Sequence, residues 1–168
     1  NNKDITEGIK RYEIETSIEL HQAITKEISK CDYFLMNAAV SDFKVSLDSK
    51  SKIPKSEIEN YLIKSFELVP DILRDICKSK KHNQIFVGFC AFTGSIKNAR
   101  KMIEDKMSHK GCDYLFANPI DIKGQGFGPL AQNEGWLFNK RNIEHHIKKT
   151  SKIDLANKLI TQIISVNK

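Results

Sequence analysis

The sequence lacks the segments and motifs that mark several large classes of protein. No apolar run approaches the roughly 20 residues of a membrane-spanning helix, so we expect no membrane partner. The GxGxxG fingerprint of dinucleotide-binding oxidoreductases and the GxxxxGK[ST] pattern of P-loop enzymes are both absent. A GxSxG serine elbow is absent too, which leaves serine-hydrolase chemistry without support.

Cysteine and histidine are present but not in ligand patterns. The four cysteines, Cys31, Cys77, Cys90 and Cys112, are isolated, and no pair has CxxC spacing. The five histidines form no HExxH or other metal spacing. We therefore expect reduced thiols in a cytoplasmic protein, with neither a zinc site nor a disulfide framework.

The charge balance is basic, with a formal net charge of +6 and a pI of about 9.1. Such a balance favours anionic partners, which are nucleotides, phosphate esters or nucleic acid. The lysines are spread through the chain and have no interleaved aromatic platform for single strands. This distribution favours small anions, and we predict no nucleic-acid partner.

Short apolar runs alternate with amphipathic segments along the chain. Buried strands are predicted at 32–40, 84–92 and 113–118, a further strand at 61–69 and an edge strand at 135–140. Helices are predicted at 16–29, 70–80, 96–111 and 150–168. The pattern indicates an α/β fold, a three-layer Rossmann-like, mostly parallel sheet with helices on both faces, in one domain over residues 1–168.

Ligands of such sheets bind at the carboxyl ends of the strands. After the first strand, Asn37, Ala38 and Ala39 are small enough to admit a ligand, and Asp42 is suited to Mg²⁺ or a ribose hydroxyl. The structural alternative is that the alanines pack beneath a helix and Asp42 caps a turn. Lys52 lies in a loop, either closing on a phosphate or simply solvated.

Later positions carry similar pairs of interpretations. Phe89 either stacks on a base or belongs to the core, and Lys106 and Lys110 lie four residues apart on one helix face. Two like charges on one face repel unless an anion lies between them, although a solvated face is also ordinary. The glycine-rich stretch 124–128 fits a lid or a hairpin-like loop.

Several motifs, in order, resemble bacterial phosphopantothenate–cysteine ligase, the synthetase half of the bifunctional coenzyme A biosynthesis flavoprotein. The resemblance extends to about Phe138, and its strength lies in the order and spacing of the motifs. The matching residues are Ala38-Ala39-Val40-Ser41-Asp42-Phe43, Lys52-Ile53-Pro54-Lys55, Pro70-Asp71-Ile72-Leu73, Val87-Gly88-Phe89-Cys90-Ala91-Phe92-Thr93, Lys106, Lys110, Asp113, Ala117-Asn118, Gly126-Phe127-Gly128 and Asn133.

The resemblance implies a ligase that uses CTP and Mg²⁺ to activate 4′-phosphopantothenate as an acyl-cytidylate, which cysteine then converts to an amide. It also implies a homodimer, with an upstream flavin-dependent decarboxylase as fused domain or partner and no FMN in this chain. The implied nucleotide-binding residues are Asp42, Lys52, Pro70, Asp71, Ile72, Leu73, Phe89, Lys106 and Lys110. Lys52 is also the implied catalytic flap residue, Asp42 the metal ligand, and Asn37, Ala38 and Ala39 border the phosphopantothenate channel.

Departures from the family pattern support a second hypothesis. Pro54 replaces a lysine of the flap motif, and Phe92 replaces a glutamate. The glycine-rich and asparagine-bearing segments that open the family's synthetase domain are not in the sequence, so we expect an N-terminally truncated domain. The alternative function is therefore a nucleotide-binding module with incomplete catalysis. Residues 61–69 or 135–140 are the expected dimer-interface strands.

Overall fold

The computed structural model describes residues 8–46, 53–125, 132–141 and 143–166. The chain forms two compact units, each described by itself. Unit 1 comprises residues 1–30 and 39–72, and unit 2 comprises residues 31–38 and 73–168. Among the described residues, no helix has the length and apolar character needed to cross a bilayer.

Unit 2 is built on a five-stranded sheet in the order β1-β4-β5-β6-β7. The β1–β4 and β4–β5 pairs are parallel and the other two pairs are antiparallel, so β6 alone runs against the rest. The strands are β1 (Tyr33–Met36), β4 (Ile85–Phe92), β5 (Tyr114–Pro119), β6 (Asn133–Asn139) and β7 (Glu144–Thr150). This arrangement confirms the predicted α/β fold with a mostly parallel sheet.

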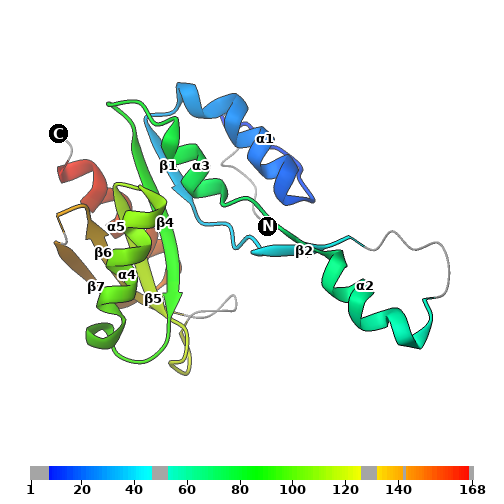
Figure 1. The fold of residues 1–168 in the computed structure, drawn as a ribbon. Helices are drawn as coiled ribbons and strands as arrows, with labels where there is room; N and C mark the ends of the chain where they lie inside the picture. The colour runs from blue at the N-terminus through cyan, green and yellow to red at the C-terminus, as the bar shows by residue number, and fades with distance from the viewer. Residues whose placement is uncertain (1–7, 47–52, 126–131, 142, 167–168) are drawn as a thin grey trace, which may run out of the picture. The chain divides into compact units, whose positions relative to one another are not determined.

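Helices cover both faces of this sheet (Figure 1). On one face, α5 (Lys152–Val166) packs over a core that contains Val87, Phe116 and Leu137. On the other face lie α3 (Ile72–Lys78) and α4 (Ile96–Lys110), whose residue Ile103 is fully buried. Successive residues of a strand point to opposite faces, so each strand sends alternate side chains to α5 and to the α3 and α4 layer.

Unit 1 carries a two-stranded antiparallel ribbon, β2 (Phe43–Val45) with β3 (Phe66–Leu68). The other elements of the unit are α1 (Ser17–Glu27), η1 (Ile28–Lys30), η2 (Lys55–Glu57) and α2 (Ile58–Ser65). Helix α1 begins where the sequence predicts, because Thr16 and Glu19 form a reciprocal capping box.

The predicted strand at 61–69 is wrong over its first half. Residues 58–65 form α2, and the strand is limited to β3. A run of apolar residues such as Tyr61-Leu62-Ile63 has no periodicity that separates a strand from a helix. The hydroxyl of Ser65 donates to the carbonyl of Tyr61, a local bond that fits the last helical turn.

The prediction of an edge strand at 135–140 is also wrong. Strand β6 lies inside the sheet, hydrogen-bonded to β5 and β7, and β7 forms the edge. The sequence EHHIKKT of β7 carries charges and a single buried side chain, Ile147, and therefore gives no alternating apolar signal. Charged side chains are a common protection for exposed sheet edges.

A half-buried carboxylate joins three strands at the amino edge of the sheet. Asp113 accepts hydrogen bonds from Lys80 Nζ at 2.5 Å, Lys140 Nζ at 2.8 Å and the backbone N–H of Phe86 at 2.8 Å. Burial alone would raise the pKa of Asp113, but these donors outweigh it and hold the pKa below its usual range. The two lysines lie in turns before β4 and after β6.

The substitution Asp113→Asn should lower the free energy of unfolding by about 3 kcal/mol at pH 7, because it leaves two lysines without their shared counter-ion. The depressed pKa means that this contribution is present above about pH 4 and is lost as the pH falls below that value. Urea unfolding should therefore show a large difference in the free energy of unfolding between wild type and variant at pH 7 and a small difference at pH 3.

Asp75→Asn is the matched control, since it removes a surface pair with Lys78 at 2.7 Å. This variant should lower the free energy of unfolding by less than about 1 kcal/mol. Equal losses for the two variants at pH 7 would contradict the structural role of Asp113.

Two glycines allow close packing in the sheet, and they should respond differently to alanine. A Cβ at Gly135 would lie 2.2 Å from Phe116 Cζ and 2.7 Å from the backbone oxygen of Ala117. A Cβ at Gly88 would meet the mobile ends of Leu73 and Leu115, at 2.7 and 2.9 Å. Gly135→Ala should lower the free energy of unfolding by about 3 kcal/mol, and Gly88→Ala should lower it by about 1 kcal/mol. Denaturant titration of both variants checks the order, and the reverse order would refute it.

Candidate functional site

The carboxyl edge of β1, β4 and β5 is the place where a sheet of this topology binds ligands. Asn37 directly follows β1, Asn118 is the penultimate residue of β5, and residues 93–95 connect β4 to α4. The turn after β4 is held by two bonds. Gly94, in the left-handed region at φ 76°, donates its N–H to Asp121 Oδ2 at 2.7 Å, and Ile120 N–H donates to the carbonyl of Phe92 at 3.0 Å.

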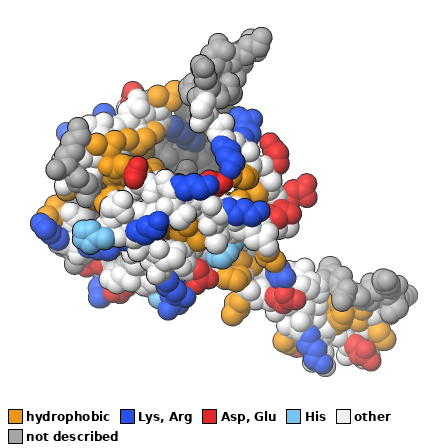
Figure 2. Space-filling view, turned by 90° about the horizontal axis from the view of Figure 1, so that it is seen from above, with side chains coloured by type: hydrophobic (Ala, Val, Ile, Leu, Met, Phe, Trp, Pro, Cys, Tyr) orange, Lys and Arg blue, Asp and Glu red, His pale blue; other side chains and the backbone are white. Residues whose placement is uncertain are grey.

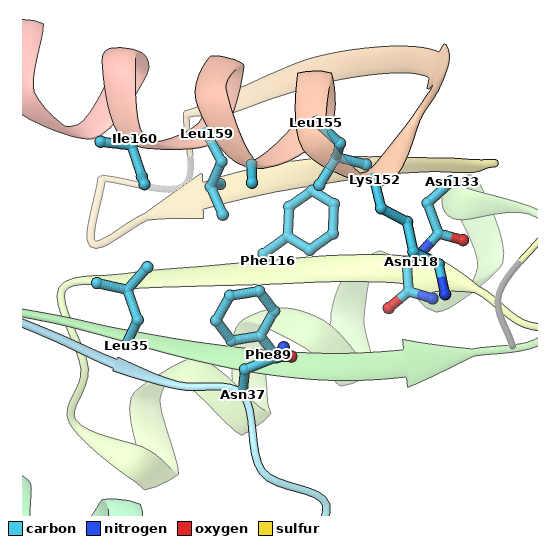
Figure 3. A pocket seen from close by; sticks show the side chains of 11 residues that line it. Leu35, Asn37, Phe89, Phe116, Asn118, Asn133, Lys152, Leu155, Leu159 and Ile160 are labelled. Atoms are coloured by element: carbon cyan, nitrogen blue, oxygen red, sulfur yellow. The ribbon is translucent and has the colours of Figure 1, made fainter. Parts of the chain in front are cut away.

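A cavity of about 280 Å³ lies between the sheet and α5, and we call it the α5 cavity. Figure 3 shows its lining, with Asn118, Asn133 and Lys152 toward one end and Leu35, Leu159 and Ile160 toward the other. Phe89 and Phe116 form its aromatic wall, with ring centroids 5.8 Å apart in an edge-to-face arrangement. The lining residues are Leu35, Asn37, Phe89, Phe116, Asn118, Asn133, Lys152, Leu155, Ala156, Leu159 and Ile160.

An open hollow of about 370 Å³ lies on the opposite face, at the start of α4, and we call it the α4 hollow. Its lining includes Phe92, Asn98, Met102 and Ile120. Asn98, Met102 and Lys106 recur every four residues and so share one stripe of α4. Lys106 therefore stands one turn beyond the hollow on the same face of the helix.

The two α4 lysines occupy different positions along the helix. Burial raises the pKa of the Cys90 thiol, and the positive charge of the exposed Lys106 partly opposes that rise. Lys110 is the last residue of α4, close to the amino edge where β5 begins. With a rise of about 1.5 Å per residue, Lys110 lies roughly 20 Å along the axis from the first turn of the helix. The carboxyl edge is thus nearer to Lys106.

Unit 1 holds the predicted residues Ala39, Asp42, Pro70, Asp71 and Ile72. Asp42 is exposed, and its carbonyl accepts the N–H of Val69 at 2.9 Å beside the β2–β3 ribbon. Pro70 is exposed and Asp71 half-buried, whereas the side chain of Ile72 is buried. Lys52 and the 126–128 loop lie outside the described residues.

In unit 2, the predicted site residues divide between the two faces of the sheet. Asn37 and Phe89 meet in the α5 cavity, whereas Leu73 is buried against Gly88 on the opposite face. Ala38 is exposed just beyond β1. The binding roles assigned to all these residues remain predictions.

Lys152 was not predicted as a site residue. Lys152 is the first residue of α5 and lines the cavity because of the way this helix packs on the sheet. The local sequence, a single lysine after Thr150-Ser151, does not reveal that packing. Asn118 and Asn133 appear in the motif order but without an assigned role. Their common location becomes visible only through the pairing of β5 with β6.

Three of the four cysteines, Cys77, Cys90 and Cys112, are not activated nucleophiles. All four carry thiols rather than disulfides. Burial raises the pKa of Cys77 to about 12 and the pKa values of Cys90 and Cys112 to about 11. These three thiols are therefore protonated at neutral pH, which excludes thiolate chemistry there.

Surface charge is mixed rather than concentrated. Figure 2 shows Lys and Arg side chains over the visible face with Asp and Glu side chains among them. Several lysines are paired, as in Lys44–Glu67 at 2.8 Å and Lys101–Asp105 at 2.7 Å. This distribution resembles a solvated surface more than a continuous nucleic-acid track.

Similar sequences, a similar solved structure and a family model all point to the same protein family. The chain is 30% identical over 159 residues to the coenzyme A biosynthesis bifunctional protein CoaBC of Borreliella burgdorferi, covering 95% of this chain and 38% of that protein. It is 33% identical to the protein of the same name from Haemophilus influenzae, covering 94% and 37%. The chain thus spans less than two fifths of the length of these curated relatives.

The fold agrees with this similarity. A crystal structure of the C-terminal domain of CoaBC superposes with a TM-score of 0.67 at 21% identity, covering 92% of this chain and 66% of that one. The family model described as the DNA/pantothenate metabolism flavoprotein C-terminal domain matches residues 1–166. The chain belongs to this family, the C-terminal domain of the DNA/pantothenate metabolism flavoproteins.

Proposed function

We propose that this chain is the synthetase part of a phosphopantothenate–cysteine ligase acting in coenzyme A biosynthesis. The observation that carries the proposal is its similarity to CoaBC proteins over about 95% of its length. The same relatives extend well beyond this chain, so a flavin-dependent decarboxylase, as fused domain or partner, belongs to the proposal.

The proposed reaction has two steps. The carboxylate of 4′-phosphopantothenate attacks the α-phosphorus of CTP, pyrophosphate leaves, and an acyl-cytidylate forms. The amine of cysteine then attacks the acyl carbon, loses a proton and expels CMP to give the amide. Both steps develop negative charge on phosphate oxygens, which cationic side chains stabilise.

The residues present suit these roles. Lys106 stands one helical turn beyond the α4 hollow on the same face of α4, and we assign its ammonium group to the triphosphate. We assign Lys110, Phe89 and residues 70–73 to the nucleotide as well, and Asn37, Ala38 and Ala39 to phosphopantothenate. Lys52 is the proposed flap residue that reaches the phosphates.

Asp42 fits the proposed Mg²⁺. Magnesium in nucleotide sites is commonly held by one or two carboxylates together with substrate phosphates and water. The described residues contain no cluster of three or more His, Cys, Asp or Glu side chains suited to a metal, so an exposed single carboxylate matches this mode better than a closed protein cage. When bound, the ion would neutralise phosphate charge.

One observation favours the second candidate, a nucleotide-binding module without complete catalysis. Phe92 is 4% exposed and packs near Trp136, with ring centroids 5.9 Å apart. It stands where the resemblance places a glutamate, so this position has no carboxylate for polar chemistry. Such a module would bind CTP but release neither pyrophosphate nor CMP.

Calorimetric titration of the chain with CTP and separately with ATP, in the presence of Mg²⁺, tests the nucleotide proposal. We expect saturable CTP binding that ATP does not match and that Lys106→Ala weakens about tenfold, the loss of one charge-assisted contact. Release of CMP on adding 4′-phosphopantothenate and cysteine then separates the ligase from the binding module.

Lys101→Ala is the matched control for this titration. Lys101 is exposed on the same helix and pairs with Asp105, so its loss should leave CTP affinity unchanged. An absence of binding for both nucleotides would contradict the proposed function.

The proposed homodimer has a candidate surface in unit 1. In the β2–β3 ribbon, Phe43 pairs with Leu68 and Val45 with Phe66, which places four apolar side chains on one face. Their exposed fractions are 51%, 87%, 46% and 50% in that order. Two-stranded ribbons are marginal alone, so a second copy covering this face would stabilise the ribbon. Strand β6 is paired on both edges and does not offer an edge to a partner.

Leu68→Asp should convert the proposed dimer into a monomer, because it places a charge in the apolar face. Sedimentation equilibrium at micromolar concentration measures the mass. Ile153→Asp is the control, since Ile153 is 76% exposed on α5 and should leave the mass unchanged. A monomeric wild-type chain would refute the dimer.

A further inference from the structure

The loop that follows β5 is bonded to the turn that follows β4. Ile120 donates its backbone N–H to the carbonyl of Phe92 at 3.0 Å, which extends the β4–β5 pairing by one step. One residue later, Oδ2 of Asp121 accepts the N–H of Gly94 at 2.7 Å. The first bond belongs to the backbone of the sheet, whereas the second is a side-chain contact that a substitution can remove without changing the sheet.

The conformation of the turn depends on Gly94. Its φ of 76° lies in the left-handed region, and a Cβ at this position would meet no atom within 4 Å. The glycine is therefore needed for backbone conformation rather than for space. Ser95 follows, and its hydroxyl caps α4 by accepting the N–H of Asn98 at 3.3 Å. A contact that fixes Gly94 therefore also fixes the start of α4.

The bond between Asp121 and Gly94 is stronger than an ordinary surface hydrogen bond. A carboxylate that accepts a backbone N–H forms a charge-assisted bond, and 2.7 Å is short for such a donor. The partial positive charge at the amino end of α4, a helix of 15 residues, adds to the attraction. Because Asp121 is exposed, its replacement leaves no cavity in the core.

This bond lies at the rim of the α4 hollow. Thr93 and Ile120 line the hollow, and each directly precedes one partner of the bond. Asn98, in the first turn of α4, lines it as well. Asp121 is not among the described lining residues, yet its bond joins the wall formed by the loop after β5 to the wall formed by the start of α4.

We propose that Asp121 is a positioning residue for the nucleotide, because its bond to Gly94 sets the spacing between these two walls of the α4 hollow. This inference rests on the proposed function, which assigns Lys106, one helical turn beyond the hollow, to the triphosphate. Asp121 acts through the backbone and does not contact the nucleotide. The property that matters is therefore a side-chain oxygen that accepts one N–H, rather than the negative charge.

Two substitutions of Asp121 separate the hydrogen bond from the charge. Asp121→Ala removes the acceptor, whereas Asp121→Asn keeps an oxygen that accepts the Gly94 N–H and removes only the charge. In the calorimetric titration with CTP and Mg²⁺, we expect Asp121→Ala to weaken binding about tenfold, the loss of one charge-assisted bond. Asp121→Asn should restore most of that affinity.

Hydrogen exchange of the ¹⁵N-labelled chain measures the same bond without a ligand. The amide of Gly94 should exchange about tenfold faster in Asp121→Ala than in the wild type, because its acceptor is lost. Glu144→Ala is the matched control. It removes an exposed carboxylate that pairs with Arg100 at the start of β7, and it should change neither the exchange of Gly94 nor the affinity for CTP.

Three results would overturn the inference while leaving the proposed function intact. The first is equal CTP affinity of wild type and Asp121→Ala, since a merely structural residue lowers stability without changing the affinity of the folded chain. The second is an Asp121→Asn variant that binds CTP no better than Asp121→Ala, which would assign the effect to charge. The third is unchanged exchange of Gly94 in Asp121→Ala. A wild-type chain that binds no CTP is a different failure, which refutes the proposed function and this inference with it.

Discussion

The carboxylate of Asp113 fixes the amino edge of the sheet in unit 2. It receives Lys80, Lys140 and the Phe86 N–H at once, and so joins the turns before β4 and after β6 to the start of β5. A half-buried anion with three donors resists displacement, because each lost bond leaves charge less well compensated. The contact therefore links the start of β4, the start of β5 and the end of β6, in agreement with the register of their backbone pairing.

The carboxyl edge inherits its geometry from this register. Gly88 and Gly135 let neighbouring layers approach where a Cβ would collide, so the sheet is closely packed beneath its ligand-facing end. Phe89 and Phe116 then lie side by side under α5, and Asn118 and Asn133 come together across the β5–β6 pairing. The α5 cavity is thus a consequence of strand order and packing rather than of one local motif.

Strand periodicity and caps made much of the fold predictable. The apolar runs at β4 and β5 are buried as predicted, and Thr16 and Gly111 mark helix ends by local chemistry. The predicted buried strand at 32–40 is wrong in its burial, because β1 covers only Tyr33–Met36, lies at one edge of the described sheet and has no buried residue. The prediction for residues 58–65 failed because a short apolar run does not distinguish a strand from a helix. Strand β7 was not predicted because a charged edge strand resembles a loop in sequence. The prediction that Asn37 follows a strand end is confirmed, whereas Phe89 lies inside β4, three residues before the strand ends at Phe92. The position of Lys152 depends on long-range packing that no local pattern carries.

Alternation along β4 has a consequence for the proposed chemistry. Phe89 faces the α5 cavity, whereas the neighbouring Cys90 points to the opposite layer. The α5 cavity and the α4 hollow are therefore separated by the sheet itself. Ligands on opposite faces of a sheet meet only beyond the strand ends, and in this unit that place is the turn formed by Thr93, Gly94 and Ser95. Two groups that react with each other from these two faces must therefore both extend to this edge.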